Sequence, residues 1–193
     1  MIQVLLDTNA YLRLAKRIRP LLGRPFGQKD YVLIILPAVE EEVRRQPKLK
    51  FRNPWFSDPE LVAERSASKI RLSFKEKETI LSTRDFLLSH VASDALRFTE
   101  KGRSPPGITD CWLLAFAMTR SAIVVTDDLG MHLLAADFDI PVWHGYELLK
   151  KMHSAKIIDS ALVREIYGAL EVNGDLTQTW IDAKATTFAK ILR

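Results

Sequence analysis

Acidic side chains follow two apolar runs of the sequence and open one strongly apolar helical pattern. Asp7 comes directly after the run 2–6, the Asp127-Asp128 pair follows the run 122–126, and Asp110 stands at the start of the helical pattern. Carboxylates that are brought together repel one another unless a cation neutralises them. Divalent cations that prefer oxygen ligands, such as Mg²⁺, meet this need. These acids are therefore candidates for a site that binds a divalent cation.

The elements that must position these acids alternate between strands and helices. Apolar runs at 2–6, 31–36, 122–126 and 140–143 predict four strands, and helical patterns separate them. This alternation favours an α/β sandwich with a mostly parallel central sheet. Ligand sites of open parallel sheets lie beyond the carboxyl ends of the strands, so the acids that follow two of these strands should meet at one edge.

Three consecutive glutamates, Glu40, Glu41 and Glu42, lie on the helix predicted over residues 38–45. On a helical wheel at about 100° per residue, Glu42 falls inside the apolar arc. Glu41 points away from that arc and Glu40 lies at its edge, so both are expected to face solvent. An inward-facing acid needs a partner. Glu42 is therefore the fourth acidic candidate.

Together these segments resemble the four motifs of PIN-domain ribonucleases, a family that includes the toxins of VapBC-type toxin–antitoxin pairs. The matching segments occur in the family's order and cover roughly residues 2–143. They are Leu5-Leu6-Asp7-Thr8-Asn9, Pro37-Ala38-Val39-Glu40-Glu41-Glu42-Val43, Thr109-Asp110 followed by Leu-Leu-Ala-Phe-Ala, and Val125-Thr126-Asp127-Asp128. Each short motif alone would be a weak signal, whereas four in order are a strong one.

The resemblance implies a PIN-like α/β/α sandwich that hydrolyses RNA phosphodiester bonds with one or two Mg²⁺ or Mn²⁺ ions. The catalytic and metal-binding acids that it implies are Asp7, Glu42, Asp110 and Asp128. Asp127 stands where the family commonly has Asn and is the alternative to Asp128 as a ligand. Asn9 and Thr126 match the family's polar supporting positions. Together with Thr8 they are candidates to hydrogen-bond the carboxylates or metal-bound water.

Two stretches depart from compact members of that family. Residues 1–144 form the expected nuclease domain, with a basic loop and a helical insertion at about 44–78. Residues 145–193 form an expected C-terminal helical extension, packed on the same domain. Trp180 and Phe188 recur there at helical spacing and could form an interface, for example in a homodimer.

Basic residues dominate the first part of the chain. Residues 1–77 hold 16 basic and 9 acidic side chains, a net charge of +7, which favours a polyanionic partner such as RNA. The RNA-binding candidates follow the first two acidic motifs and are Arg13, Arg44, Arg45, Lys48, Lys50 and Arg52. Trp55 and Phe56 would either stack on RNA bases or fill a groove of the protein itself.

Several functions are compatible with this pattern. The leading hypothesis is the toxin of a type II toxin–antitoxin pair, with an antitoxin protein as partner. The alternatives are a PIN nuclease of RNA processing and a catalytically silent module that binds RNA or a partner. A haloacid-dehalogenase-like phosphatase is disfavoured, because Asn9 stands where a second aspartate would be needed.

Composition favours a cytoplasmic protein without a membrane anchor. The chain of 193 residues has one Cys, which excludes a disulfide framework and suits a reducing compartment. Its apolar runs fall far short of the roughly 20 residues that span a bilayer. Its first residues lack the basic segment of a signal peptide.

Overall fold

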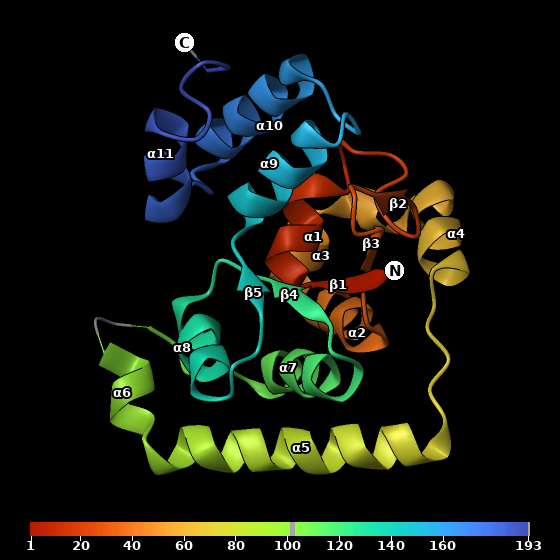
Figure 1. Cartoon of the computed structure of the whole chain (residues 1–193), viewed down its shortest axis with the longest axis vertical. Helices are drawn as coiled ribbons and strands as arrows, with labels where there is room; N and C mark the ends of the chain where they lie inside the picture. Colours follow the sequence, from red (N-terminus) through yellow and green to blue (C-terminus); the bar gives the residue numbers. More distant parts are fainter. Residues whose placement is uncertain (101–102, 193) are drawn as a thin grey trace.

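A five-stranded sheet forms the centre of the molecule in the computed structural model, which describes residues 1–100 and 103–192 (Figure 1). Its strand order is β2-β3-β1-β4-β5, and only β2 runs antiparallel to its neighbour. The strands are β1 (Ile2–Leu6), β2 (Pro25–Phe26), β3 (Tyr31–Ile34), β4 (Ile123–Val125) and β5 (Val142–Trp143). The predicted α/β class with a mostly parallel sheet is confirmed, and β2 is an addition to the predicted strands.

Strand β1 lies in the middle of the sheet and sets the position of the acids. Leu5 pairs with Ile34 of β3 on one side and with Val124 of β4 on the other. One residue beyond the end of β1, the backbone N–H of Asp7 still donates to the carbonyl of Val125, at 3.1 Å. The chain segments that follow β1 and β4 therefore leave the sheet side by side.

Helices cover both faces of the sheet. Figure 1 shows α7 and α8 on one side, α1 and α9 on the other, and the long helix α5 outside α7. The helices are α1 (Thr8–Leu14), α2 (Pro37–Arg45), α3 (Pro47–Arg52), the 3-10 helix η1 (Pro54–Ser57), α4 (Pro59–Ala67), α5 (Phe74–Ser93), α6 (Ala95–Thr99), α7 (Ile108–Arg120), α8 (Leu129–Asp137), α9 (Gly145–Ser154), α10 (Ser160–Asn173) and α11 (Gln178–Ala185). Within the described residues, no helix is long and apolar enough to span a bilayer.

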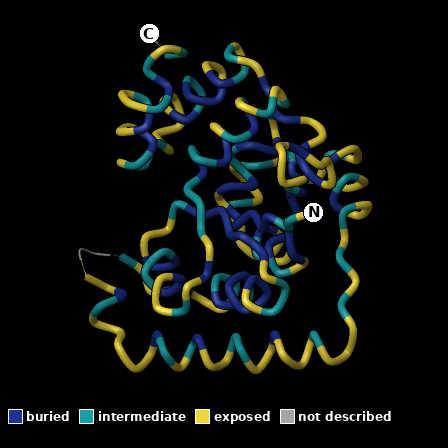
Figure 2. Tube along the Cα trace, viewed as in Figure 1, coloured by how far each residue is buried: buried dark blue, intermediate teal, exposed yellow. Residues whose placement is uncertain are grey.

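Helix α7 is buried between the sheet and α5. Its residues Cys111 and Leu113–Ala117 are all buried, as the apolar pattern of the sequence predicts. Figure 2 shows the contrast with α5, whose outer side is exposed along its whole length. The close packing of these buried residues holds α7, and with it Asp110 in its first turn, in a fixed position.

Three helices make up the C-terminal segment, and their large side chains point into this chain. Trp180 and Phe188 are completely or almost completely buried, at 0% and 1% exposure. Both rings pack against Tyr167 of α10, with centroids 5.3 and 5.4 Å away. The expectation that these two side chains form an intermolecular interface is wrong, because α10 covers them.

Arg65 of α4 is buried at the join between the insertion and the rest of the domain. Its guanidinium lies 3.4 Å from the Glu40 carboxylate and donates to the Tyr11 hydroxyl at 3.1 Å and to the Phe56 carbonyl at 2.8 Å. It also lies over the Phe56 ring, 3.9 Å from the centroid. Glu40 is therefore buried and ion-paired, which corrects the expectation that it faces solvent. The wheel of α2 alone could not reveal that α4 covers this edge.

This ion pair generates a stability prediction. Arg65→Met leaves the Glu40 carboxylate buried beside an apolar side chain, so we expect a loss of about 3–5 kcal/mol in the free energy of unfolding. Arg45 of α2, the helix of Glu40, pairs with Glu41 at the surface. Arg45→Met should lower the free energy of unfolding by less than about 1 kcal/mol. Urea unfolding followed by circular dichroism measures both. Equal, small losses in the two variants would show that the buried pair is unimportant.

The double variant Glu40→Leu/Arg65→Met provides the control for cavity formation. Replacing both charged partners by apolar side chains should recover most of the loss, because no unpaired charge then remains buried.

Candidate active site

Asp7 links the end of β1 to the start of α1. Its backbone is extended, and its Oδ1 accepts a hydrogen bond from the backbone N–H of Ala10 at 2.5 Å, which caps the helix. The side chain is buried, and this burial raises the pKa of Asp7 to about 7. Hydrogen bonds from Thr126 and Ala10 oppose the rise, while the charge of Asp127 adds to it.

Glu42 reaches the same edge from α2. The hydroxyl of Thr8 donates to Glu42 Oε2 at 2.6 Å, and the amide of Gln46 donates to Oε1 at 2.9 Å. The side chain is half-buried, in agreement with its place in the apolar arc of the wheel. Thr8, predicted to support an acid, thus orients Glu42 beside the Asp7 segment.

Asp110 lies in the first turn of α7, where its Oδ2 accepts from the backbone N–H of Gly107 at 2.8 Å. Partial burial raises the pKa of Asp110 to about 6, against the effect of that hydrogen bond. The negative charges of Asp128 and Glu42 raise it further. Asp110 is therefore close enough to Asp128 and to Glu42 to feel the charge of each.

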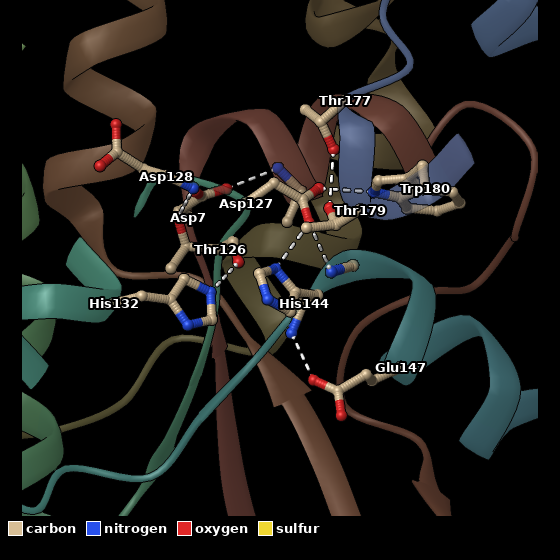
Figure 3. A network of polar contacts seen from close by, with 12 residues as sticks. Asp7, Thr126, Asp127, Asp128, His132, His144, Glu147, Thr177, Thr179 and Trp180 are labelled. Atoms are coloured by element: carbon tan, nitrogen blue, oxygen red, sulfur yellow. Dashed lines mark hydrogen bonds and ion pairs between the residues drawn. The ribbon is translucent and has the colours of Figure 1, made fainter. Parts of the chain in front are cut away.

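Asp128 caps α8 through Oδ1, which accepts from the backbone N–H of Met131 at 2.9 Å. Its own backbone N–H donates to the Thr126 hydroxyl at 3.0 Å. Figure 3 shows the carboxylates of Asp128 and Asp127 turned in opposite directions. Asp128 is exposed, so one of its oxygens stays accessible to a ligand.

Asp127 is bonded inside the protein through both oxygens (Figure 3). Oδ2 accepts from the Arg13 guanidinium at 2.6 Å and from the Trp180 indole N–H at 2.7 Å. Oδ1 accepts from the backbone N–H of Gly145 at 3.0 Å and lies 3.4 Å from His144 Nδ1. Burial works against ionisation, yet these donors hold the pKa of Asp127 below its usual range. The structure favours Asp128 over Asp127 as the acid open to a ligand.

The remaining predicted residues lie in different surroundings. Asn9 is exposed. Arg44 and Arg45 pair with Glu40 and Glu41 one helical turn earlier, so part of their charge is neutralised. Three further basic candidates are exposed along α3: Lys48, Lys50 and Arg52.

A groove of about 430 Å³ opens between α1, the α3–η1 segment and the end of α10. Four of its lining side chains are basic: Arg13, Lys16, Arg17 and Arg52. Trp55 also lines the groove, whereas Phe56 is buried under Arg65. The sequence left two roles possible for these rings, stacking on RNA bases or filling the protein itself. Phe56 fills the protein interior, and Trp55 reaches the groove.

Sequence reasoning missed the side chains that surround Asp127. Trp180 lies 53 residues away in the sequence and Arg13 lies 114 residues away. No local pattern marks such a contact. The doublet Asp127-Asp128 is the one sequence signal that these acids differ in role. Adjacent side chains at the end of a strand point in opposite directions, so both acids cannot face the same site.

The acids have the ligand chemistry that Mg²⁺ and Mn²⁺ prefer, namely carboxylate oxygen. In the side-chain positions that they adopt, however, no group of three or more His, Cys, Asp or Glu side chains among the described residues is arranged to hold a metal ion. The acids thus match such an ion in the chemistry of their oxygens, whereas their ligand atoms are not gathered around a single point.

Comparisons with known proteins add little to this site. No family model matches the chain, and a search of curated proteins finds no match. Among solved structures, the crystal structure of FitAcB from Neisseria gonorrhoeae is similar, with 16% sequence identity and a TM-score of 0.45. The similarity covers 74% of this chain and 98% of that chain. A TM-score of this size establishes no common family, so the function must be inferred from the site.

The raised pKa of Asp7 predicts how stability depends on pH. The folded protein binds this proton more tightly than the unfolded chain does, since the pKa is about 7 against an ordinary 3.8. The contribution to the free energy of unfolding is therefore greatest below about pH 4 and is lost as pH rises to about 7. Asp7→Asn keeps a good helix cap and removes the charge. We expect it to raise stability at pH 8 by up to about 4 kcal/mol, at about 1.36 kcal/mol per pKa unit.

Urea unfolding of metal-free protein between pH 4 and pH 8 provides the measurement. Asp159 caps α10 at an exposed position, and Asp159→Asn should keep the pH profile of the wild type. An unchanged profile in Asp7→Asn as well would show that the Asp7 carboxyl is not protonated in this range.

Proposed function

We propose that this protein is a metal-dependent ribonuclease that hydrolyses RNA phosphodiester bonds. The observation that carries the proposal is that Asp110 feels the charges of Glu42 and Asp128, while the segments of Asp7 and Asp128 leave the sheet side by side. Burying and crowding carboxylates is unfavourable unless a bound cation compensates. Mg²⁺ or Mn²⁺, one or two ions, would be held by these four acids.

The protein's own contribution is to fix the acids before a cation arrives. Asp7, Asp110 and Asp128 each accept a hydrogen bond from a backbone N–H near the start of a helix, which fixes the direction of the carboxylate. For Asp110 and Asp128 this leaves the second oxygen for a ligand. Thr8 and Gln46 fix Glu42, each by a hydrogen bond to one of its two carboxylate oxygens. The bound cation would orient and help to deprotonate a water molecule and neutralise charge on the scissile phosphate.

RNA as the substrate is supported by the groove beside the acids. Asn9 and Arg13, which follow Asp7 on α1, line it, so the groove begins next to the acidic edge. Its basic side chains suit phosphates, and the Trp55 ring suits an unstacked base. The four-motif resemblance to PIN-domain ribonucleases points to the same substrate.

A role as the toxin of a toxin–antitoxin pair is part of the proposal and rests on that resemblance. It implies an antitoxin partner, a cytoplasmic site of action and, as in many relatives, a homodimer. A silent RNA-binding module is the second candidate, because the described acids are not arranged to hold an ion as they lie. A PIN nuclease of RNA processing has the same chemistry and differs only in its target.

The direct test is cleavage of labelled single-stranded RNA with Mg²⁺ or Mn²⁺. Asp7→Asn, Glu42→Gln, Asp110→Asn and Asp128→Asn should each lower the rate by at least about 100-fold, the upper end of what loss of a supporting contact to a metal ligand costs. EDTA should abolish cleavage, and added Mn²⁺ should restore it.

Glu41→Gln is the matched control, because Glu41 lies next to Glu42 on the outward side of α2 and is exposed. Its rate should equal that of the wild type. If all four acidic variants also cleave like the wild type, the activity comes from elsewhere. If the wild type binds RNA without cleaving it, the silent module is the better description.

A further inference from the structure

The Asp127 carboxylate connects three parts of the chain that are distant in sequence. It binds Arg13 of α1 and the start of α9 at Gly145. It also binds Trp180 of α11 (Figure 3). Only 4% of the Asp127 side chain is exposed. Three hydrogen bonds reach its two oxygens, and His144 Nδ1 lies 3.4 Å from Oδ1. Since an ionised carboxylate offers about four lone-pair sites, most of this one's capacity is used within the protein.

The packing around this carboxylate leaves no room for a side chain at position 145. A Cβ atom added at Gly145 would lie 3.0 Å from Asp127 Oδ2 and 2.8 Å from the Trp180 ring. Real Cβ atoms essentially never come within 3.0 Å of such a neighbour. The close approach of α9 and α11 to Asp127 therefore depends on a glycine at position 145.

Arg13 is oriented by two fixed contacts at the border between this network and the groove. One of its terminal nitrogens donates to Asp127, and the other donates to the backbone carbonyl of Asp175, at 3.2 Å. The planar guanidinium carries five N–H donors in a fixed arrangement. Arg13 lines the groove, so its further donors are available to a phosphate there.

We propose that Asp127 is a positioning residue that acts through Arg13, and that Arg13 binds a phosphate of the RNA strand in the groove. The C-terminal helices are then part of the substrate-binding edge, because Trp180 and Asp175 complete the contacts that orient Arg13. This inference rests on the proposed ribonuclease function, whose substrate binding it describes in more detail. It assigns Asp127 a role different from that of the adjacent Asp128.

The test compares Asp127→Asn with Asp128→Asn by three measurements that need no RNA cleavage. The first is the affinity for single-stranded RNA in EDTA, the second is the affinity for Mn²⁺ alone, and the third is the indole N–H resonance of Trp180 in a ¹H–¹⁵N spectrum. In Asp127→Asn an amide N–H₂ replaces a carboxylate oxygen and faces other donors, so the contacts to Arg13 and Trp180 are disturbed. RNA should then bind about tenfold more weakly, and the Trp180 resonance should move. Its Mn²⁺ affinity should stay within a factor of about two. Asp128→Asn should weaken Mn²⁺ binding without moving the Trp180 resonance.

Arg13→Gln tests the route from Asp127 to the RNA. It should weaken RNA binding as much as Asp127→Asn does, and the double variant should be no weaker than either single variant. Lys77→Gln on α5 removes the same charge away from the groove and should leave RNA affinity unchanged. If Asp127→Asn does not fold, Trp180→Phe removes one donor to Oδ2 and should weaken RNA binding in the same direction.

Three results would overturn the inference. Loss of Mn²⁺ binding in Asp127→Asn to the extent seen in Asp128→Asn would make Asp127 a ligand. An RNA affinity equal to that of the wild type in a folded Asp127→Asn or Trp180→Phe variant would exclude the positioning of Arg13 by Asp127. Absence of RNA binding by the wild-type protein would exclude it as well. Failure of the proposed function is a separate result, namely RNA binding of the expected pattern without metal-dependent cleavage.

Discussion

Carboxylates gathered at the ends of parallel strands repel one another, and the strand order brings them together here. Strand β1 lies between β3 and β4, so the residues that follow it are close to those that follow β4. Helix α7, fixed between the sheet and α5, adds Asp110, and α2 adds Glu42. Burial is the main cause of the raised pKa values of Asp7 and Asp110. The charge of Asp127 adds to the rise at Asp7, and the charges of Asp128 and Glu42 add to it at Asp110.

The fold limits the cost of this repulsion by local hydrogen bonds. Asp7 and Asp128 cap α1 and α8, and Asp110 accepts from a backbone N–H at the start of α7. The start of a helix favours negative charge, which partly offsets the loss of hydration. The same hydrogen bonds fix the direction of each carboxylate, so the contacts that stabilise the fold also orient the acids of the proposed site.

The basic groove and the Asp127 network depend on segments far from the acids in the sequence. Arg65 fixes the insertion against α2 through a buried pair with Glu40, and this insertion supplies Arg52 and Trp55 to the groove. Trp180 connects the C-terminal helices to Asp127. Both connections are buried polar contacts of a charged side chain, where loss of one partner is expensive.

Local patterns predicted those features that depend on local physics. Buried apolar runs predicted β1, β3, β4 and β5, and the wheel placed Glu42 inward. The two-residue strand β2 escaped notice because it is too short to show an alternation. The surroundings of Glu40 and Trp180 could not be predicted, since Arg65 and Tyr167 reach them only through tertiary packing.

Proton release during Mn²⁺ binding tests the central claim most directly, that crowded carboxylates at this edge hold a divalent cation. Titration calorimetry at pH 6.5 in two buffers of different ionisation enthalpy measures the number of protons released. The account predicts that Mn²⁺ binds to the wild type with release of protons, because the pKa values of Asp7 and Asp110 are about 7 and about 6 without metal. Asp7→Asn should release fewer protons. Absence of Mn²⁺ binding, or binding without proton release, would contradict the account.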